Sequence, residues 1–159
     1  WQRTPRHLQR DTAMIELYVT QLIGAGEHDL ADKLVQRSIK HAWNSNLVRL
    51  YGFIESKDPS RQLTRAESWL ATHPQDANLL LSLGRLSARD KLWGKAREYF
   101  ESSYRLDRSA EVCAELGRLL TAMDESKIAA AYFREGLLAR EQELPVLPLP
   151  DKQASVSTA

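Results

Sequence analysis

The sequence is poor in the residues that build disulfides, turns and membrane spans. It contains one cysteine, Cys113, seven glycines and six prolines among its 159 residues. A single cysteine excludes a disulfide within the chain and a zinc site made of cysteines alone. So few glycines and prolines exclude a collagen-like or globally disordered chain. No apolar run approaches the roughly 20 residues that a membrane-spanning helix needs.

The sequence also has no excess of positive or negative side chains. Lys and Arg number 22, Asp and Glu 21, and the formal net charge is +1. This balance does not indicate a general nucleic-acid binder, and we expect no nucleic-acid partner. The chain begins at Trp1 rather than Met, so we expect it to be part of a longer protein. Membrane anchoring would then come only from a segment upstream of this chain.

Motifs for catalysis and for cofactor binding are missing from the sequence. Gly24-Ala25-Gly26 begins like a dinucleotide-binding loop, but it lacks the third glycine and a preceding strand, so a turn between helices is the better interpretation. There is no phosphate-binding loop, His-Glu-x-x-His motif or nucleophile elbow. The histidines match no local metal motif in their spacing: His7, His28, His41 and His73. We therefore predict no enzyme activity, no metal and no resident cofactor.

The apolar residues recur with a helical period. In the segment 77–89 one face carries Leu79, Leu80, Leu83 and Leu86. In the segment 95–106 one face carries Ala96, Tyr99, Phe100, Tyr104 and Leu106. A short connection at 90–94 separates the two segments, so they predict an antiparallel helical hairpin. No convincing alternating strand pattern is present.

The same hairpin recurs 33 residues later. Leu83-Gly84-Arg85-Leu86 aligns without a gap with Leu116-Gly117-Arg118-Leu119, and Tyr99-Phe100 aligns with Tyr132-Phe133. This offset is close to the 34-residue tetratricopeptide period. We expect Gly84 to allow close approach of the paired helices, and Phe100 to fill the space between hairpins.

Two weaker copies precede these units. In the second copy, Leu47 to Ile54 is expected to form the first helix. The distance from Gly52 to Ala66 is fourteen residues, which predicts a longer turn and a shorter second helix. An ordinary bundle with chance periodicity is the alternative, and the two gap-free units argue against it.

The predicted fold is therefore an all-α, tetratricopeptide-type α-solenoid of about four antiparallel hairpins in a right-handed superhelix. Residues 1–8 are expected to end a preceding element, and 142–159 to form a flexible, proline-containing tail. The repeat domain at 9–141 divides into repeats at 12–42, 45–74, 77–109 and 110–141.

Arginines recur on the face where first helices of such arrays line a concave groove. Arg85 and Arg118 hold the same place in consecutive repeats. The arginines and their amide neighbours form a candidate anion-binding set: Arg49, Asn46, Asn78, Arg85, Arg89 and Arg118. Arginines in a concavity suit carboxylates of an acidic peptide or of a tetrapyrrole. Solvated surface arginines, some paired with Glu111 or Glu115, are the equal alternative.

Several segments resemble the HemY family, tetratricopeptide inner-membrane proteins of proteobacteria associated with late protohaem synthesis. The resemblance runs to about residue 140. Its most specific motif is Trp93-Gly94-Lys95-Ala96-Arg97, and the others are 24–29, 47–52, 73–76 and 79–86. It implies a domain on the cytoplasmic side of the bacterial inner membrane, with haem-biosynthesis enzymes as partners and haem or protoporphyrin as a ligand. The family brings no catalytic residues with it.

Taken together, these features predict a non-enzymatic interaction or scaffold domain acting in a late step of haem biosynthesis. A generic tetratricopeptide scaffold for cell-envelope assembly, unrelated to haem, is the alternative. An enzyme or a direct haem carrier is a third class, and the lack of a catalytic set and the scattered histidines argue against it.

Overall fold

The computed structural model describes residues 11–141, and the predictions for 1–8 and 142–159 lie outside this range. The described chain is all helical, as predicted, and contains no strand. None of its helices is long and apolar enough to cross a membrane. The elements are α1 (Thr12–Gly24), α2 (His28–His41), α3 (Ser45–Tyr51), α4 (Pro59–Ser68), the 3₁₀ helix η2 (Trp69–Ala71), α5 (Ala77–Arg89), α6 (Trp93–Leu106), α7 (Ala110–Ala122) and α8 (Ser126–Glu141).

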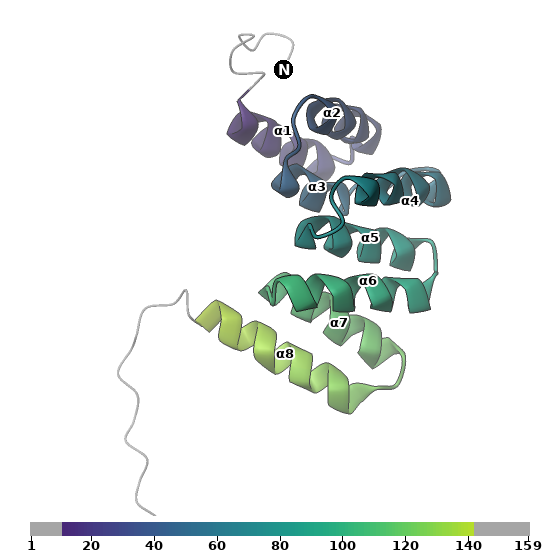
Figure 1. The fold of residues 1–159 in the computed structure, drawn as a ribbon, viewed down its shortest axis with the longest axis vertical. Helices are drawn as coiled ribbons and strands as arrows, with labels where there is room; N and C mark the ends of the chain where they lie inside the picture. Colours follow the sequence, from purple (N-terminus) through teal and green to yellow (C-terminus); the bar gives the residue numbers. More distant parts are fainter. Residues whose placement is uncertain (1–10, 142–159) are drawn as a thin grey trace, which may run out of the picture.

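The helices pair into antiparallel hairpins that stack one after another, from α1 and α2 at one end to α7 and α8 at the other (Figure 1). Each of the four predicted repeat ranges contains two helices, which pack directly on each other in the first, third and fourth ranges, whereas in the second α4 packs on α5. Between hairpins, α3 packs on α5 and α6 packs on α7. The first helices of the second, third and fourth hairpins are α3, α5 and α7.

Short polar side chains define where the helices begin. Asp11, Asn44, Asp58, Asp76 and Ser109 each accept a hydrogen bond from the backbone N–H three residues further on. Such N-caps satisfy backbone donors that have no partner inside the helix. The sequence thereby fixes the start of five helices.

The tight turns inside the hairpins also follow the repeat. Lys91 between α5 and α6 has φ 61°, and Asp124 between α7 and α8 has φ 64°. These two left-handed residues lie 33 positions apart, as do the repeats themselves. In the first hairpin the same conformation is taken by a glycine, Gly26 at φ 77°. Each turn therefore reverses the chain with one left-handed residue.

The second hairpin departs from this plan. The prediction that Gly52 and Ile54 belong to its first helix is wrong, because α3 ends at Tyr51. Ile54 is buried all the same, and its carbonyl accepts a hydrogen bond of 2.9 Å from Nε2 of the buried Gln62. The turn is long and α4 has only ten residues, as the spacing from Gly52 to Ala66 predicted.

Gly84 and Gly117 each lie directly under a phenylalanine ring, which leaves no room for a side chain at either position. A Cβ atom at Gly84 would lie 2.3 Å from Cδ1 of Phe100, and one at Gly117 would lie 2.5 Å from Cε1 of Phe133. The prediction of close approach at Gly84 is correct, and it is the Phe100 ring that makes this contact. Phe100 is buried, whereas Phe133 is 39% exposed because no described element follows α8.

We predict that Gly84→Ala destabilises the protein by about 1–2 kcal/mol. The higher helix propensity of alanine would stabilise α5 by about 1 kcal/mol, but the clash with the buried Phe100 ring costs more than this. The control is Gly94→Ala, because Gly94 lies in α6 with open space around it. This change should leave stability equal or raise it by up to about 1 kcal/mol. Urea unfolding followed by circular dichroism compares the two, and equal effects would contradict the packing argument.

Candidate functional site

A hollow of about 580 Å³ opens where the first helices and the turn after α3 meet. Its lining combines arginines, exposed aromatic rings and small apolar side chains. The lining residues are Gly52, Phe53, Arg85, Ala88, Arg89, Trp93, Phe100, Glu115, Arg118, Leu119 and Ala122. We call this hollow the groove pocket. It holds three of the six residues that the sequence predicted: Arg85, Arg89 and Arg118.

Three arginines of this region are paired with glutamates of α7. Arg85 donates from Nη2 to Glu111 Oε1 at 2.7 Å and from Nε to Glu115 Oε1 at 2.9 Å. Arg49 Nη1 lies 3.2 Å from both carboxylate oxygens of Glu111. Arg118 Nη2 reaches Glu115 Oε2 at 2.6 Å. These five residues form an ion-pair ladder across α3, α5 and α7, in which each arginine has a carboxylate partner.

Arg85 and Arg118 occupy equivalent positions in the repeat, but their environments in the structure differ. The side chain of Arg85 is 8% exposed and that of Arg118 is 67% exposed. Arg85 is covered by both glutamates and by Phe53, whose ring centre lies 4.1 Å from the guanidinium carbon. One nitrogen of Arg85, Nη1, is buried without a hydrogen-bond partner. Only Arg118 therefore presents most of its charge to solvent.

Arg89 binds the backbone of the turn after α3. Its Nη1 donates to the carbonyl oxygen of Ile54 at 2.9 Å and its Nη2 to that of Gly52 at 3.2 Å. Burial lowers the pKa of this guanidinium. The two carbonyls flank Phe53, so Arg89 holds in place the turn that carries the Phe53 ring.

The two predicted asparagines do not line the groove pocket. Asn78 Nδ2 donates to Ser45 Oγ at 3.0 Å, which joins the starts of α5 and α3. Asn46 is exposed on α3. Arg49 also lies outside the lining and is connected to it through Glu111.

Two exposed aromatic side chains complete the groove pocket. Trp93, the first residue of α6, is 50% exposed, and Phe53 is exposed in the turn after α3. From the sequence, Trp93 stands out only as part of the motif Trp93-Gly94-Lys95-Ala96-Arg97, and Phe53 is missed. The signal for Phe53 is weak, because a single aromatic residue in an irregular turn belongs to no helical period.

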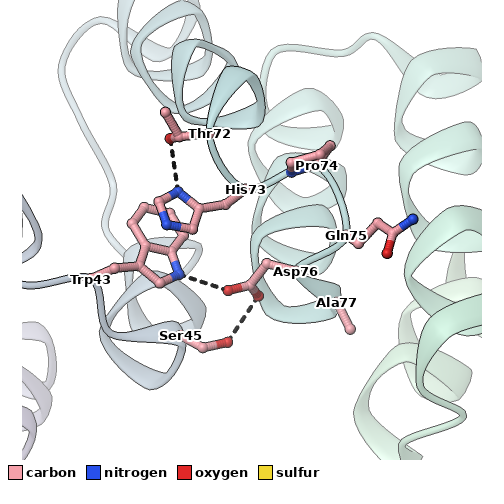
Figure 2. A pocket seen from close by; sticks show the side chains of 8 residues that line it. All are labelled: Trp43, Ser45, Thr72, His73, Pro74, Gln75, Asp76 and Ala77. Carbon is pink, nitrogen blue, oxygen red and sulfur yellow. Dashed lines mark hydrogen bonds between the residues drawn. The ribbon is translucent and has the colours of Figure 1, made fainter.

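A second hollow, of about 600 Å³, lies beside the link from α2 to α3 (Figure 2). There the His73 ring stacks on Trp43 with centres 3.6 Å apart and planes 5° apart. Asp76 accepts hydrogen bonds from Trp43 Nε1 at 2.9 Å and from Ser45 Oγ at 2.8 Å, and Nδ1 of His73 lies 2.8 Å from Thr72 Oγ1. These groups bind one another, and the cluster fastens the start of α5 to the start of α3.

Metal-binding side chains are dispersed in residues 11–141, where no three of His, Cys, Asp and Glu gather in a way that could hold an ion. His28 accepts a hydrogen bond at Nδ1 from the Glu55 backbone N–H at 3.2 Å. Cys113 is buried, and burial raises the pKa of its thiol. Neither residue lines the groove pocket.

No family model matches the chain, and no curated protein matches it. Solved structures of MamA do resemble it. A MamA RS-1 double mutant has a TM-score of 0.61 at 21% identity, covering 87% of this chain and 80% of that one. MamA from Desulfovibrio magneticus RS-1 has a TM-score of 0.58 at 19% identity, with the same coverage. MamA from MSR-1 has a TM-score of 0.57 at 16% identity, covering 84% of this chain and 79% of that one.

At such low identity the likeness concerns the fold alone. It shows that this chain has a tetratricopeptide-type helical fold, as the 33-residue repeat predicted. The more specific resemblance to the HemY family stays a prediction.

We predict that Arg85→Ala lowers the free energy of unfolding by about 2 kcal/mol, because two partly buried carboxylates lose their shared cation and keep one arginine each. Arg118→Ala should lower it by less than about 1 kcal/mol, since an exposed ion pair adds little. Chemical denaturation of the two variants measures both effects. Equal losses of unfolding free energy in the two variants would show that the ion-pair ladder does not depend on the buried Arg85.

Proposed function

We propose that this domain is a non-enzymatic protein-interaction module whose groove pocket binds an extended segment of a partner protein. The observation that carries the proposal is the placement of the exposed Phe53 and Trp93 beside the exposed Arg118 in one hollow. Aromatic residues and arginines dominate binding energy at protein interfaces. An apolar side chain of the partner would enter between the two rings.

The charge around the groove pocket favours a carboxylate next to that apolar side chain. Arg49, Arg85, Arg89 and Arg118 bring four positive charges, and Glu55, Glu111 and Glu115 bring three negative ones. The excess is one positive charge. Arg118 is the accessible one, because Arg89 is bound to backbone carbonyls and Arg85 is buried. A partner carboxylate would accept hydrogen bonds from Arg118 beside Glu115, which accepts from its Nη2.

The chemistry of the lining supports binding rather than catalysis. Glu115 is the single carboxylate of the lining, and two arginines already hold it. The other lining side chains are apolar or cationic. A general base or nucleophile needs a free titratable group within reach of the substrate.

We further propose that the partner is a haem-biosynthesis enzyme, and that the domain lies on the cytoplasmic side of the bacterial inner membrane. This part of the proposal rests on the HemY resemblance. A scaffold for envelope assembly unrelated to haem remains the alternative. For the ligand itself, a peptide suits the groove pocket better than a tetrapyrrole. Its lining contains no histidine to bind iron, and glutamates already occupy Arg49 and Arg85.

Selection of random twelve-residue peptides against the 159-residue chain tests the groove. We expect enriched peptides to combine an apolar residue with Asp or Glu. Trp93→Ala and Arg118→Glu should each weaken their binding at least about tenfold. The matched control is Arg61→Glu, which reverses an exposed arginine on α4, away from the groove pocket.

Peptides that bind all these variants equally would contradict the groove proposal. Haem and protoporphyrin titrations, followed by absorbance and tryptophan quenching, form the second arm. Saturable binding that Trp93→Ala and Arg118→Glu abolish, without enrichment of acidic peptides, would make a tetrapyrrole the ligand.

A further inference from the structure

One hydrogen-bond donor of the groove pocket has no acceptor in the protein. Arg85 lines this pocket, and its side chain is 8% exposed. Its Nε and Nη2 donate to Glu115 and Glu111, but Nη1 is buried, and no group of residues 11–141 accepts a hydrogen bond from it. Buried donors without an acceptor are rare in folded proteins, because nothing compensates for their lost hydration. Nη1 is therefore a candidate donor to a bound ligand.

The Phe53 ring lies over the guanidinium group that carries this donor. The ring centre is 4.1 Å from the guanidinium carbon. Phe53 belongs to the turn between α3 and α4, and it is 39% exposed. The ring thus lies between a buried cation and the solvent, where it shields the guanidinium from the groove pocket.

The ring can move while the backbone of the turn stays in place. Arg89 holds the carbonyls of Gly52 and Ile54, on either side of Phe53. Gly52 also packs closely on Arg85, because a Cβ atom there would lie 3.0 Å from Arg85 Cδ. None of these contacts involves the Phe53 side chain, and exposed side chains change rotamer within picoseconds to nanoseconds. Rotation of the ring alone would uncover Nη1.

The charges around Arg85 determine which acceptor suits Nη1. Glu111 Oε1 at 2.7 Å and Glu115 Oε1 at 2.9 Å already contact the same guanidinium. A third carboxylate there would be repelled by both glutamates. A neutral carbonyl oxygen escapes this repulsion, and its hydrogen bond with a cation is stronger than one between neutral groups. Nη1 therefore favours a neutral carbonyl, in contrast to the exposed Arg118.

We infer that Nη1 of Arg85 binds a main-chain carbonyl oxygen of the partner segment, and that the Phe53 ring is a lid over this subsite. The inference rests on the proposed function, since the partner segment supplies the carbonyl. Each peptide unit of an extended segment offers a carbonyl acceptor. An apolar side chain that displaces the Phe53 ring thus brings a main-chain acceptor with it. The groove pocket would hold the main chain of its partner through Arg85 and select its side chains elsewhere.

Nuclear magnetic resonance of the 159-residue chain with ¹⁵N-labelled arginine tests this inference. The probe is N-acetylglycine methylamide, which has two neutral carbonyls and no side chain. In Phe53→Ala it should bind at least about tenfold more tightly than in the unchanged chain, because no ring has to move, and it should shift the Arg85 side-chain signals. N-acetylglycinate is the matched anionic probe and should shift the Arg118 signals instead. Arg85→Lys identifies the Arg85 signals by their loss.

Trp93→Ala is the matched control variant. It removes the other exposed ring of the groove pocket, and the amide probe should bind Arg85 in it no more tightly than in the unchanged chain. Arg85 signals that the amide probe leaves unchanged in Phe53→Ala would overturn the inference. It would also be overturned if the anionic probe bound Arg85 as tightly as the amide.

The peptide selection described above separates this inference from the proposed function. If no peptide is enriched but the amide probe binds Arg85, the proposed function is wrong and the carbonyl subsite stands. If enriched peptides bind through Trp93 and Arg118 but leave the Arg85 signals unchanged, this inference is wrong and the proposed function stands.

Discussion

The buried guanidinium of Arg85 connects three consecutive hairpins of the array. It lies on α5, contacts the Phe53 ring after α3, and donates to Glu111 and Glu115 on α7. Such a buried pair is a weak source of net stability, because removal of the charges from water offsets much of their attraction. Its geometry, however, fixes how the first helices sit beside one another. The shape of the groove pocket depends on that spacing.

Because Arg85 is bound to Glu111 and Glu115, its positive charge is not available to a ligand in the groove pocket. Arginines on the concave face of an array suggest an anion site, but here α7 supplies the anions itself. What remains accessible is one cation, Arg118, beside two exposed rings. Arg89 contributes indirectly, since it holds the turn that places one of those rings. The proposed recognition surface is thus mainly aromatic, with charge at one side to set orientation and selectivity.

The sequence predicts the array well and the groove only in part. The gap-free 33-residue offset predicts the hairpins, and the glycine at position 84 predicts the close contact that Phe100 makes. Arg85 and Arg118 look alike in sequence because the repeat aligns them. They differ in burial because Arg85 lies between described hairpins and Arg118 lies in the last described hairpin. Phe53 lies outside any period, in a turn whose position depends on the distant Arg89.

A solenoid is stabilised mainly by contacts between neighbouring hairpins, and the hairpin of α7 and α8 has a described neighbour on one side only. The groove pocket is built from the turn after α3, from α5 and α6, and from α7, and therefore spans three hairpins. A ligand in it would add contacts between α7 and the hairpins before it, and binding to the folded state alone raises stability.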